Sequence, residues 1–570
     1  MRGARLLLDS LARRGVDTVF GIPGGASLSI YEEMSSMDLR HILGRHEGST
    51  VFMADGFSRV SRKPGVFLGT SGPGATNAVT GVATAYTDSS PVICITGQVA
   101  TQSMGRDAFQ EADSFNLMVP VTKWNFKLKH GAEIPRVINR AFRIATSGRF
   151  GPVAIDVPSD VVSKEVDEAS IQWADEPSLA NSSDLSELAN AVSMIRNAAK
   201  PAIIAGGGVR WSDSGDVVIR LAEKIGAPVV TTVMGKGGIP EDHPLALGTT
   251  GMHGRRSSHW VLNEADLVIA VGTRFSDRTT GKTSGFLPNA KVIHIDIDRA
   301  EIGKNITGVV GLAGNSADVL NAIMSGLDYQ AESRSEWVKK VSEVRTFCQC
   351  DFDLPGNPIK PQKLMSSLSR LLPDDAILTT DVGQHQMFAS HFFETRGRRQ
   401  FITSGGLGTM GFGFPAAVGA KIAAPERKVV SIVGDGGFQM SYSEFITAVE
   451  NEVPVFTVIM NNQSLGMVRQ FQKQFYGNRV YAADYRRSPD FAKFAEAMGG
   501  EGVTVEKASE INEAIARGLK SDVPFIADVR VDINEDILPM TPPWMGQEGT
   551  IYGRCKWRDV KVEEPQNIGN

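Results

Sequence analysis

The chain is predicted to be an α/β protein made of three doubly wound parallel-sheet domains. Two observations predict this class. Short apolar runs alternate with helical patterns along the sequence, which is typical of parallel sheets covered by helices on both faces. The length of 570 residues is also far more than one hydrophobic core usually serves, so several domains are expected.

The first domain is expected to span residues 1–165. Its apolar runs indicate buried strands that alternate with helices. These runs are Thr18–Gly21, 41–43, Gly65–Gly69 and 92–96. The same rhythm of strand, glycine turn and helix returns in the last third of the chain, so the first and third domains are expected to have related folds.

The second and third domains are expected at residues 185–335 and 360–545. Polar segments at 163–183 and 330–361 are interpreted as linkers, and 546–570 as a C-terminal tail. The strands of the second domain end in or run into Gly or Asp, as strands of nucleotide-binding sheets often do. The strands predicted for the two domains are 202–205, 267–271, 292–296, 376–380, 429–433 and 455–460.

The composition excludes several classes of function. A formal net charge of -5 offers no basic face for nucleic acid, and the longer apolar runs are too short to cross a bilayer. Four cysteines are too few and too scattered for a disulfide framework or a zinc site. The chain is therefore expected to be a soluble cytoplasmic protein, organellar only if a transit peptide has been removed.

The strongest local motif is Gly434-Asp435-Gly436-Gly437, which directly follows an apolar strand. Asn462 ends the next strand, and the carboxyl ends of adjacent parallel strands form the edge where ligands bind. Asp435, Asn462 and Ser464 supply hard oxygen donors suited to Mg²⁺. The glycines let backbone N–H groups approach a diphosphate, so the motif predicts a magnesium and diphosphate site.

A Ser-x-x-Glu pattern opens the helix predicted between these two strands. In Ser441-Tyr-Ser-Glu444 we expect a capping box, in which the serine hydroxyl caps the helix and the Glu444 carboxylate reaches back to the serine N–H. Such a cap satisfies N–H groups that the first helical turn leaves free.

Glu47 belongs to a second group of motifs, in the first domain. On its own, Arg45-His46-Glu47 is typical of a solvated helix start. Three further polar or glycine-rich segments follow strands of the same domain, at 21–26, 70–77 and 96–99. Together with Glu47 they resemble the pyrimidine-binding domain of thiamine-diphosphate enzymes, which argues against a merely solvated helix start.

These motifs, taken jointly and in order, resemble the catalytic subunits of the acetohydroxyacid (acetolactate) synthase family of thiamine-diphosphate enzymes. The resemblance extends from about residue 5 to about residue 543. Further segments that carry it are 107–111, 122–125, 381–387, 405–412, 465–468 and 538–540. It implies a pyrimidine-binding first domain, a central FAD-binding-like domain and a diphosphate-binding third domain.

The resemblance implies a role for each site residue. Glu47 would hydrogen-bond the aminopyrimidine of thiamine diphosphate, and Met410 would lie under the bent cofactor. Phe109 and Gln110 would line the reaction space, and Arg278 would hold the carboxylate of the second 2-oxo acid. The remaining thiamine-diphosphate contacts implied are Pro23, Gly24, Thr70, Asn77, Gln384, His385, Gly408, Gly434, Gly436, Gly437 and Met467.

The middle domain resembles the FAD-binding pattern of the same family, and a flavin there would be structural because carboligation involves no net redox change. The contacts implied are Arg149, Gly206, Gly207, Gly208, Met252, His253, Gly272, Arg274, Asp296 and Ile297. One match departs from the pattern: Gly314 is followed by Asn315 where the family commonly has Asp, which puts the adenosine-side contact in doubt.

Three positions of the access channel also depart from the family. Phe471 replaces an indole that favours 2-oxobutanoate as acceptor, so that preference should be weaker here. Ala100 stands where proline is usual, and Ser159 where lysine is usual. Because family herbicides plug this channel, we expect poor inhibition by sulfonylureas and imidazolinones.

The function expected is acetolactate synthesis from two 2-oxo acids, with thiamine diphosphate, Mg²⁺ and FAD, in branched-chain amino acid biosynthesis. The acceptor would be pyruvate or 2-oxobutanoate. The partners implied are a second copy of the chain, as a homodimer or homotetramer, and a separate small regulatory subunit. The alternatives are a flavin-dependent pyruvate oxidase, a carboligase with another acceptor, and a non-catalytic homologue, against which intact Glu47, Asp435 and Asn462 argue.

Overall fold

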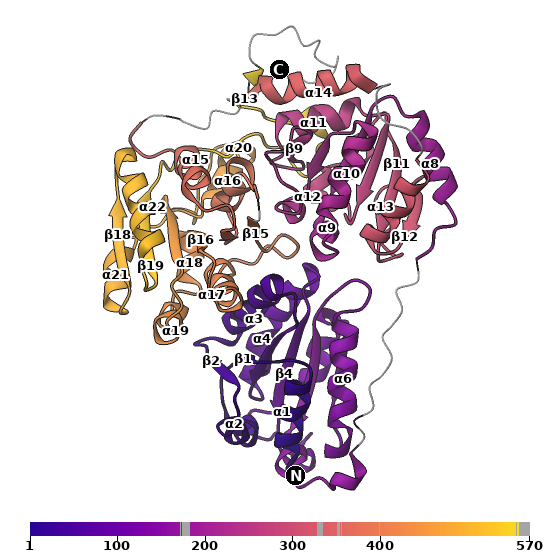
Figure 1. Ribbon diagram of the computed structural model, residues 1–570. Coiled ribbons are helices and arrows are strands. Elements are labelled where there is room, and N and C mark those ends of the chain that lie inside the picture. Colours follow the sequence, from indigo (N-terminus) through magenta and orange to yellow (C-terminus); the bar gives the residue numbers. More distant parts are fainter. Residues whose placement is uncertain are drawn as a thin grey trace.

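The computed structural model describes residues 1–171, 173, 183–327, 334–349, 354, 356–397, 399–553 and 556–557. Figure 1 shows three α/β units, with the N-terminal unit at the bottom, the middle unit at the upper right and the C-terminal unit at the upper left. Each unit contains one six-stranded sheet, which confirms the predicted fold class. Parts of both predicted linkers and most of the predicted tail lie outside the described residues.

The N-terminal sheet has the strand order β2-β1-β3-β4-β6-β5, and its pairings are parallel. Its strands are β1 Thr18–Gly21, β2 Arg40–Leu43, β3 Gly65–Gly69, β4 Val92–Gln98, β5 Trp124–Lys127 and β6 Val153–Pro158. Its helices are α1 Gly3–Arg13, α2 Leu28–Met34, α3 Glu47–Ser61, α4 Pro73–Thr87, α5 Ser114–Met118, α6 Ile134–Ala145 and α7 Ser159–Ser163. Helix α6 forms here because its apolar residues recur at helical spacing and bury one face among the sheet and α1.

The middle sheet has the order β12-β11-β10-β7-β8-β9 and is also parallel. Its strands are β7 Pro201–Ala205, β8 Val229–Thr231, β9 Ala246–Thr249, β10 Leu267–Val271, β11 Lys291–Asp296 and β12 Val310–Ala313. Its helices are α8 Leu188–Asn197, α9 Gly207–Trp211, α10 Gly215–Ile225, α11 Arg256–Glu264, α12 Asp277–Thr280, α13 Ser316–Ser325 and α14 Ser335–Phe347. The order reverses between β7 and β10, the kind of switch point at which dinucleotides bind.

The C-terminal sheet has the order β15-β14-β16-β17-β19-β18. Its strands are β14 Ile377–Thr380, β15 Gln400–Ile402, β16 Val429–Gly434, β17 Phe456–Asn461, β18 Glu501–Val505 and β19 Phe525–Arg530. Its helices are α15 Pro361–Leu371, α16 Gln384–Phe392, α17 Gly413–Ala423, α18 Asp435–Gln439, α19 Glu444–Glu450, α20 Gly466–Phe475, α21 Phe491–Ala497 and α22 Ile511–Lys520. A short antiparallel pair, β13 Cys348–Gln349 with β20 Lys556–Trp557, lies apart from the three sheets. Counted along each domain, the N-terminal and C-terminal sheets have the same strand order, as the sequence rhythm predicted.

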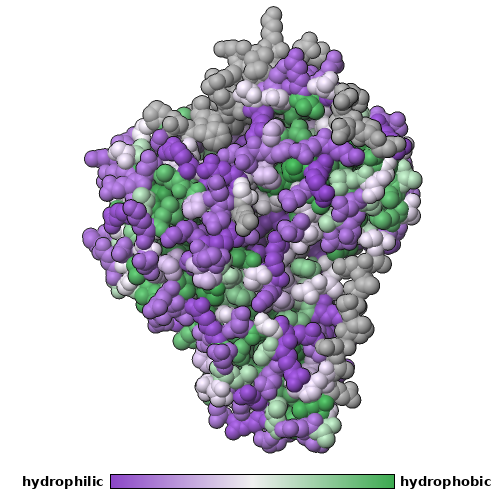
Figure 2. Space-filling view, in the orientation of Figure 1, coloured by the Kyte–Doolittle hydropathy of each residue, from purple (hydrophilic) through white to green (hydrophobic). Residues whose placement is uncertain are grey.

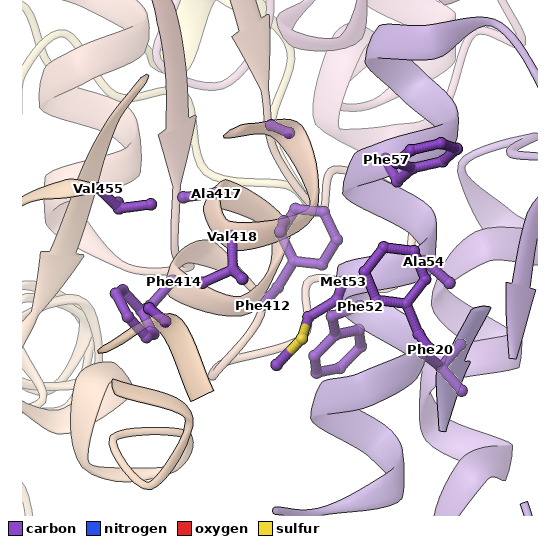
Figure 3. Packing of buried hydrophobic residues seen from close by; sticks show 14 of the residues in the cluster. Phe20, Phe52, Met53, Ala54, Phe57, Phe412, Phe414, Ala417, Val418 and Val455 are labelled. Atoms are coloured by element: carbon purple, nitrogen blue, oxygen red, sulfur yellow. The ribbon is translucent and has the colours of Figure 1, made fainter. Parts of the chain in front are cut away.

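The N-terminal and C-terminal units share one hydrophobic core, formed where α3 packs against α17 (Figure 3). Two glycines let the helix backbones approach closely. A Cβ on Gly56 would come within 2.1 Å of the Ala416 carbonyl oxygen, and one on Gly419 within 1.8 Å of the Met53 carbonyl oxygen. Phe52 and Phe412 then meet edge to face across this contact, with ring centroids 5.5 Å apart. The two units of one chain are therefore fixed to each other by packing.

Within the described ranges, every helix falls short of the length and apolar character that a bilayer crossing demands. On the face shown in Figure 2, hydrophilic residues cover much of the surface, and hydrophobic residues form smaller areas between them.

Candidate active site

A pocket of about 560 Å³, here called the C-terminal pocket, opens at the carboxyl edge of the C-terminal sheet. Strands β16 and β17 pair in parallel with Gly434 opposite Met460, so Asp435 and Asn462 follow neighbouring strands, as the spacing predicted. The residues expected at the magnesium, diphosphate and thiazolium positions that line this pocket are Gln384, His385, Gly408, Met410, Gly434, Asp435, Gly436, Gly437, Asn462, Ser464 and Met467.

Asp435 is the acidic residue that follows β16 in the pocket lining, and it is 1% exposed. Its Oδ2 atom is buried and has no hydrogen-bond partner among the described residues. Burial raises the pKa of Asp435 to about 7, because a carboxylate loses hydration there without gaining a cation. A divalent cation beside Oδ2 would give this oxygen a partner and would compensate the carboxylate for its lost hydration. Asp435 therefore fits a Mg²⁺ ligand.

Asn462 and Ser464 lie on the loop that follows β17. The Asn462 side chain donates to Gln384 Oε1 at 3.2 Å and accepts the Ser464 N–H at 3.1 Å. Gln463, between them, has a φ of 55°, a left-handed conformation that a non-glycine residue adopts at some cost. The Ser464 hydroxyl donates its hydrogen to Asp484 Oδ1 at 2.8 Å. The lone pairs of the Ser464 oxygen are therefore available to a cation.

His385 and several glycines line the pocket together with Asp435. His385 is 6% exposed, its Nε2 atom lacks a partner in the described part of the chain, and burial lowers its pKa to about 3. A Cβ on Gly434 would come within 2.9 Å of the His385 ring, and one on Gly436 within 2.5 Å of the Tyr485 hydroxyl. A neutral imidazole and bare backbone N–H groups fit a phosphate group that must approach closely.

Asp381, the first residue of the segment 381–387, had no role in the predicted site, and it anchors the loop that carries Met410. Its buried carboxylate accepts the Gly411 N–H at 2.9 Å and the Val382 N–H at 2.6 Å. Burial raises the pKa of Asp381 to about 6. The signal that could have found it is a lone carboxylate at the end of a strand, directly before a glycine turn. Met410 itself is half-buried and lines the pocket.

The residues expected around the pyrimidine gather at the carboxyl edge of the N-terminal sheet. Glu47 is the first residue of α3, half-buried, and its Oε2 accepts the Asn77 amide at 2.9 Å. Two close approaches involve neighbouring loops of this edge. A Cβ on Gly24 would come within 2.6 Å of the Thr70 side chain, whose Oγ1 is buried without a partner in the described ranges, and Gly72 lies against Gln110. Pro23 directly precedes Gly24 and is exposed.

Phe109 and Gln110 have the exposure and strain of a binding loop. The Phe109 side chain is 88% exposed, and Gln110 has a φ of 61°. A Cβ on Gly72 would come within 2.8 Å of the Gln110 carbonyl oxygen, which explains the glycine at the start of α4. None of the residues expected to bind the pyrimidine, Glu47 included, lines the C-terminal pocket. Within one chain, the structure thus keeps the two halves of the expected site apart.

A second pocket of about 260 Å³, here called the middle pocket, lies between the N-terminal and middle units. The residues expected at a flavin that line it are Arg149, Gly207, Gly208, Gly272, Arg274, Asp296 and Ile297. Gly206 precedes them, and a Cβ there would come within 2.2 Å of the Gly272 carbonyl oxygen. This lining fits an anionic dinucleotide for three reasons. It has a close glycine turn, it contains arginines, and among its described residues the buried Thr250 hydroxyl has no hydrogen-bond partner.

Arg149 joins the two units that form the middle pocket. Its Nε donates to Ser89 at 2.8 Å and its Nη1 to Glu301 at 3.1 Å. Asn315, the departure from the family pattern, also lines this pocket. Its side chain accepts the Ala317 N–H at 2.9 Å and caps α13, a task that aspartate also performs.

Two expected flavin contacts lie elsewhere: Met252 and His253 line the C-terminal pocket rather than the middle one. Arg278 lines both pockets. Its side chain is 57% exposed, and its Nε stands 3.8 Å from Asp277 Oδ2, too far for a hydrogen bond. A planar guanidinium in this position fits the carboxylate of a substrate. The flavin motifs thus extend to the rim that separates the two pockets.

The three channel positions are also divided between the units. Phe471, on α20, lines the C-terminal pocket. Ala100 and Ser159 follow β4 and β6 at the carboxyl edge of the N-terminal sheet, and neither lines one of the two pockets.

Comparisons with known proteins match all three units to one family. Residues 1–117 match the thiamine pyrophosphate enzyme N-terminal TPP binding domain, 188–323 the central domain, and 381–529 the C-terminal TPP binding domain. These segments contain Glu47, the middle pocket glycines, and Asp435 with Asn462, respectively. Thiamine diphosphate is therefore the cofactor of the fold.

Several curated relatives are similar over nearly the whole chain. A probable acetolactate synthase large subunit of Methanocaldococcus jannaschii is 45% identical, covering 99% of this chain and 97% of its own. The large subunit of acetolactate synthase isozyme 1 of Escherichia coli is 42% identical over 95% of this chain and 96% of its own. That of Lactococcus lactis is 39% identical over 96% of each. The chain belongs to the acetolactate synthase large-subunit family of thiamine pyrophosphate enzymes.

Proposed function

We propose that this chain condenses pyruvate with a second 2-oxo acid to an acetohydroxy acid, in agreement with relatives that are named acetolactate synthase large subunits. The observation that carries the proposal is the buried, unpartnered Asp435 Oδ2 at the sheet edge that it shares with Asn462. In a thiamine-diphosphate fold, this edge is suited to a magnesium ion that holds the diphosphate. The comparisons favour this reaction over a flavin-dependent pyruvate oxidase.

The cofactor, when bound, supplies a nucleophilic carbon and an electron sink for decarboxylation. The chain's own residues have the remaining tasks. Asp435, Asn462 and Ser464 would hold Mg²⁺, while Gln384, His385 and the glycines after β16 would hold the phosphates. Met410 would support the cofactor from a loop that Asp381 fixes. These assignments rest on the lining of the C-terminal pocket.

Glu47 would hold a proton in a hydrogen bond to the ring nitrogen of the aminopyrimidine, and Asn77 orients its carboxylate. Arg278, at the rim of both pockets, would bind the carboxylate of the acceptor acid through its planar donor pair. Phe109 and Gln110 would complete the wall of the reaction space.

A second copy of the chain is needed to complete this site. Glu47 is absent from the lining of its own C-terminal pocket, while packing of α3 on α17 fixes the two units of one chain to each other. A homodimer that places the N-terminal edge of one copy over the C-terminal pocket of the other would unite the two halves. The smallest active unit proposed is therefore a homodimer. Two such dimers could form a homotetramer.

The middle pocket would hold FAD in a structural role. The glycine turn after β7 would approach the pyrophosphate, and Arg149 and Arg274 would offset its charge. A separate small regulatory subunit is a further proposed partner, supported by the words "large subunit" in the names of the relatives.

The choice of acceptor depends on the wall that Phe471 forms. Its phenyl ring leaves more space than the indole common in the family, so we propose a weak preference between pyruvate and 2-oxobutanoate. A competition assay without oxygen, with both acids, Mg²⁺, thiamine diphosphate and FAD, tests the function. Acetohydroxy acid products with an oxidised flavin spectrum support it; reduction of the flavin at the rate of pyruvate consumption would point to an oxidase.

A further inference from the structure

The carboxylate of Glu444 crosses from the C-terminal unit to the loop that precedes Glu47 in the same chain. Its Oε1 accepts the N–H of His46 at 2.9 Å, and both oxygens stand 3.1 Å from the N–H of Arg45. Thr447, one turn further along α19, has its hydroxyl 2.9 Å from Glu444 Oε2 and 3.3 Å from the Leu43 carbonyl oxygen. Glu444 is fully buried in this position.

This arrangement replaces the capping box that the sequence predicted. Helix α19 begins at Glu444, its N-cap is Ser443, and no side chain caps it. The Ser441 hydroxyl is buried without a partner in the described part of the chain. The capping-box prediction was therefore wrong: the Glu444 carboxylate binds another domain instead of its own helix start.

The loop held by Glu444 sets the position of Glu47. Arg45 and His46 are the two residues directly before it, and α3 begins at Glu47 itself. A Cβ on Gly44 would come within 1.8 Å of the Thr50 hydroxyl, so the loop has little freedom on its other side. A shift of the two N–H groups would therefore change where the Glu47 carboxylate points.

We propose that Glu444 is a positioning residue that aims the Glu47 carboxylate by binding the backbone N–H groups of Arg45 and His46. The proposal rests on the proposed function of Glu47. It assigns a role to a carboxylate that touches neither of the two pockets. Because Glu47 would serve the site of a second copy, Glu444 supports that site from the chain that donates Glu47.

The raised pKa of Glu444 indicates that this carboxylate positions the loop before Glu47 rather than stabilising the fold. Burial raises the pKa of Glu444 to about 6, because desolvation outweighs its hydrogen bonds and the nearby Arg45 charge. The charged and titratable groups around it are Arg45, His46 and Glu47 on the loop side, and Glu450 on its own helix, which pairs with Arg45. A carboxylate with a raised pKa lowers the stability of the fold above that pKa.

The test compares three variants of the full-length chain loaded with thiamine diphosphate, Mg²⁺ and FAD. Glu444→Gln keeps the shape but puts an amide N–H₂ where Oε2 accepts, and Glu444→Ala removes both acceptors. Glu450→Gln is the matched control, since it removes an ion pair to Arg45 without touching the backbone N–H groups. Turnover and KM for pyruvate are measured together with thermal stability and with amide hydrogen exchange of residues 43–47 in the cofactor-free protein.

The expected result is a fall in kcat of about tenfold for Glu444→Gln and more for Glu444→Ala, with KM changed less than about twofold. Hydrogen exchange at 43–47 should be faster in both variants, and Glu444→Gln should melt no lower than the wild type at pH 8. The control should match the wild type. Unchanged turnover or exchange in the Glu444 variants would overturn the proposal, as would a loss of turnover that only follows a lower melting temperature.

A Glu47→Gln variant measured alongside separates this inference from the function on which it rests. If Glu47→Gln keeps full turnover, the proposed role of Glu47 fails, and the positioning role fails with it. If Glu47→Gln is inactive while both Glu444 variants behave as the wild type, the positioning role alone is wrong.

Discussion

The backbone N–H of Gly406 donates a hydrogen bond of 2.7 Å to Asp88 Oδ1, which joins the glycine-rich loop before Met410 to the end of α4. Asp88 also accepts from Arg59 at 2.9 Å, and Arg59 reaches the Thr403 carbonyl oxygen at 2.8 Å. All the groups involved except Gly406 are buried. The N-terminal unit therefore holds a wall of the C-terminal pocket of its own chain.

Replacing Asp88 should destabilise the protein and loosen that wall. In Asp88→Asn, an amide N–H₂ faces the buried Arg59 guanidinium, so we expect a loss of about 3 kcal/mol and weaker binding of thiamine diphosphate. Denaturant titration and cofactor titration measure the two effects. Asp374→Asn is the control, because Asp374 is 69% exposed where it pairs with Arg396 and should change stability by less than about 1 kcal/mol. Equal behaviour of the two variants would contradict this reading.

Gly419→Ala should separate α3 from α17. The added methyl group would stand 1.8 Å from the Met53 carbonyl oxygen, which is backbone and cannot swing away. We expect a loss of about 3 kcal/mol from overpacking, seen as a lower melting temperature. At Gly25 a Cβ meets nothing within 4 Å, so Gly25→Ala should leave the melting temperature unchanged. A wild-type melting temperature for Gly419→Ala would mean that the helices tolerate separation.

Asp296 should show opposite effects on stability and on flavin binding. Burial raises its pKa from 3.8 to about 6. Between these values the folded state binds more protons than the unfolded state, so stability falls as the pH rises through this window. Asp296→Asn should therefore be more stable than the wild type at pH 8, by about 3 kcal/mol at most, and equal to it near pH 4. Flavin affinity should fall. A stability difference that does not change with pH would exclude this account.

Phe471→Trp should restore a preference for 2-oxobutanoate. The larger ring narrows the wall of the C-terminal pocket, and a change of this size alters selectivity by about tenfold. The ratio of the two acetohydroxy acids in a competition assay measures it. Phe475→Trp, four residues later on α20, is the matched control, because Phe475 packs on Trp544 with ring centroids 5.0 Å apart and does not line the pocket. A ratio that moves equally in both variants would remove Phe471 from its role.

Much of the fold could be predicted because buried parallel strands leave a simple signal. The apolar runs before Gly434 and before Asn462 form neighbouring strands, and the carboxyl edge they share forms the wall of a pocket. The periodicity also predicted that the first and third sheets are related. Edge strands such as β5 and β18 were not predicted, because their half-exposed residues lack a continuous apolar run.

Contacts between domains could not be predicted from local patterns. Ser441-Tyr-Ser-Glu444 has the form of a capping box, yet Glu444 binds the N–H of His46, which lies 398 residues away in the sequence. Met252 and His253 belong to a flavin-like motif but line the other pocket, because the two pockets share a rim. The Asp88 contact to Gly406 likewise depends on how whole domains pack. A sequence motif specifies a donor or an acceptor, while the packing of domains decides its partner.

We propose that each active site takes Glu47 from one chain and Asp435 from another. Mixing Glu47→Gln and Asp435→Asn chains, each inactive alone, and letting the subunits exchange tests it directly. Mixed dimers would then contain one site with both residues intact, so turnover should return to about a quarter of the wild-type value. If the mixture stays as inactive as its two components although mixed dimers form, Glu47 and Asp435 would not act in a site shared between two chains.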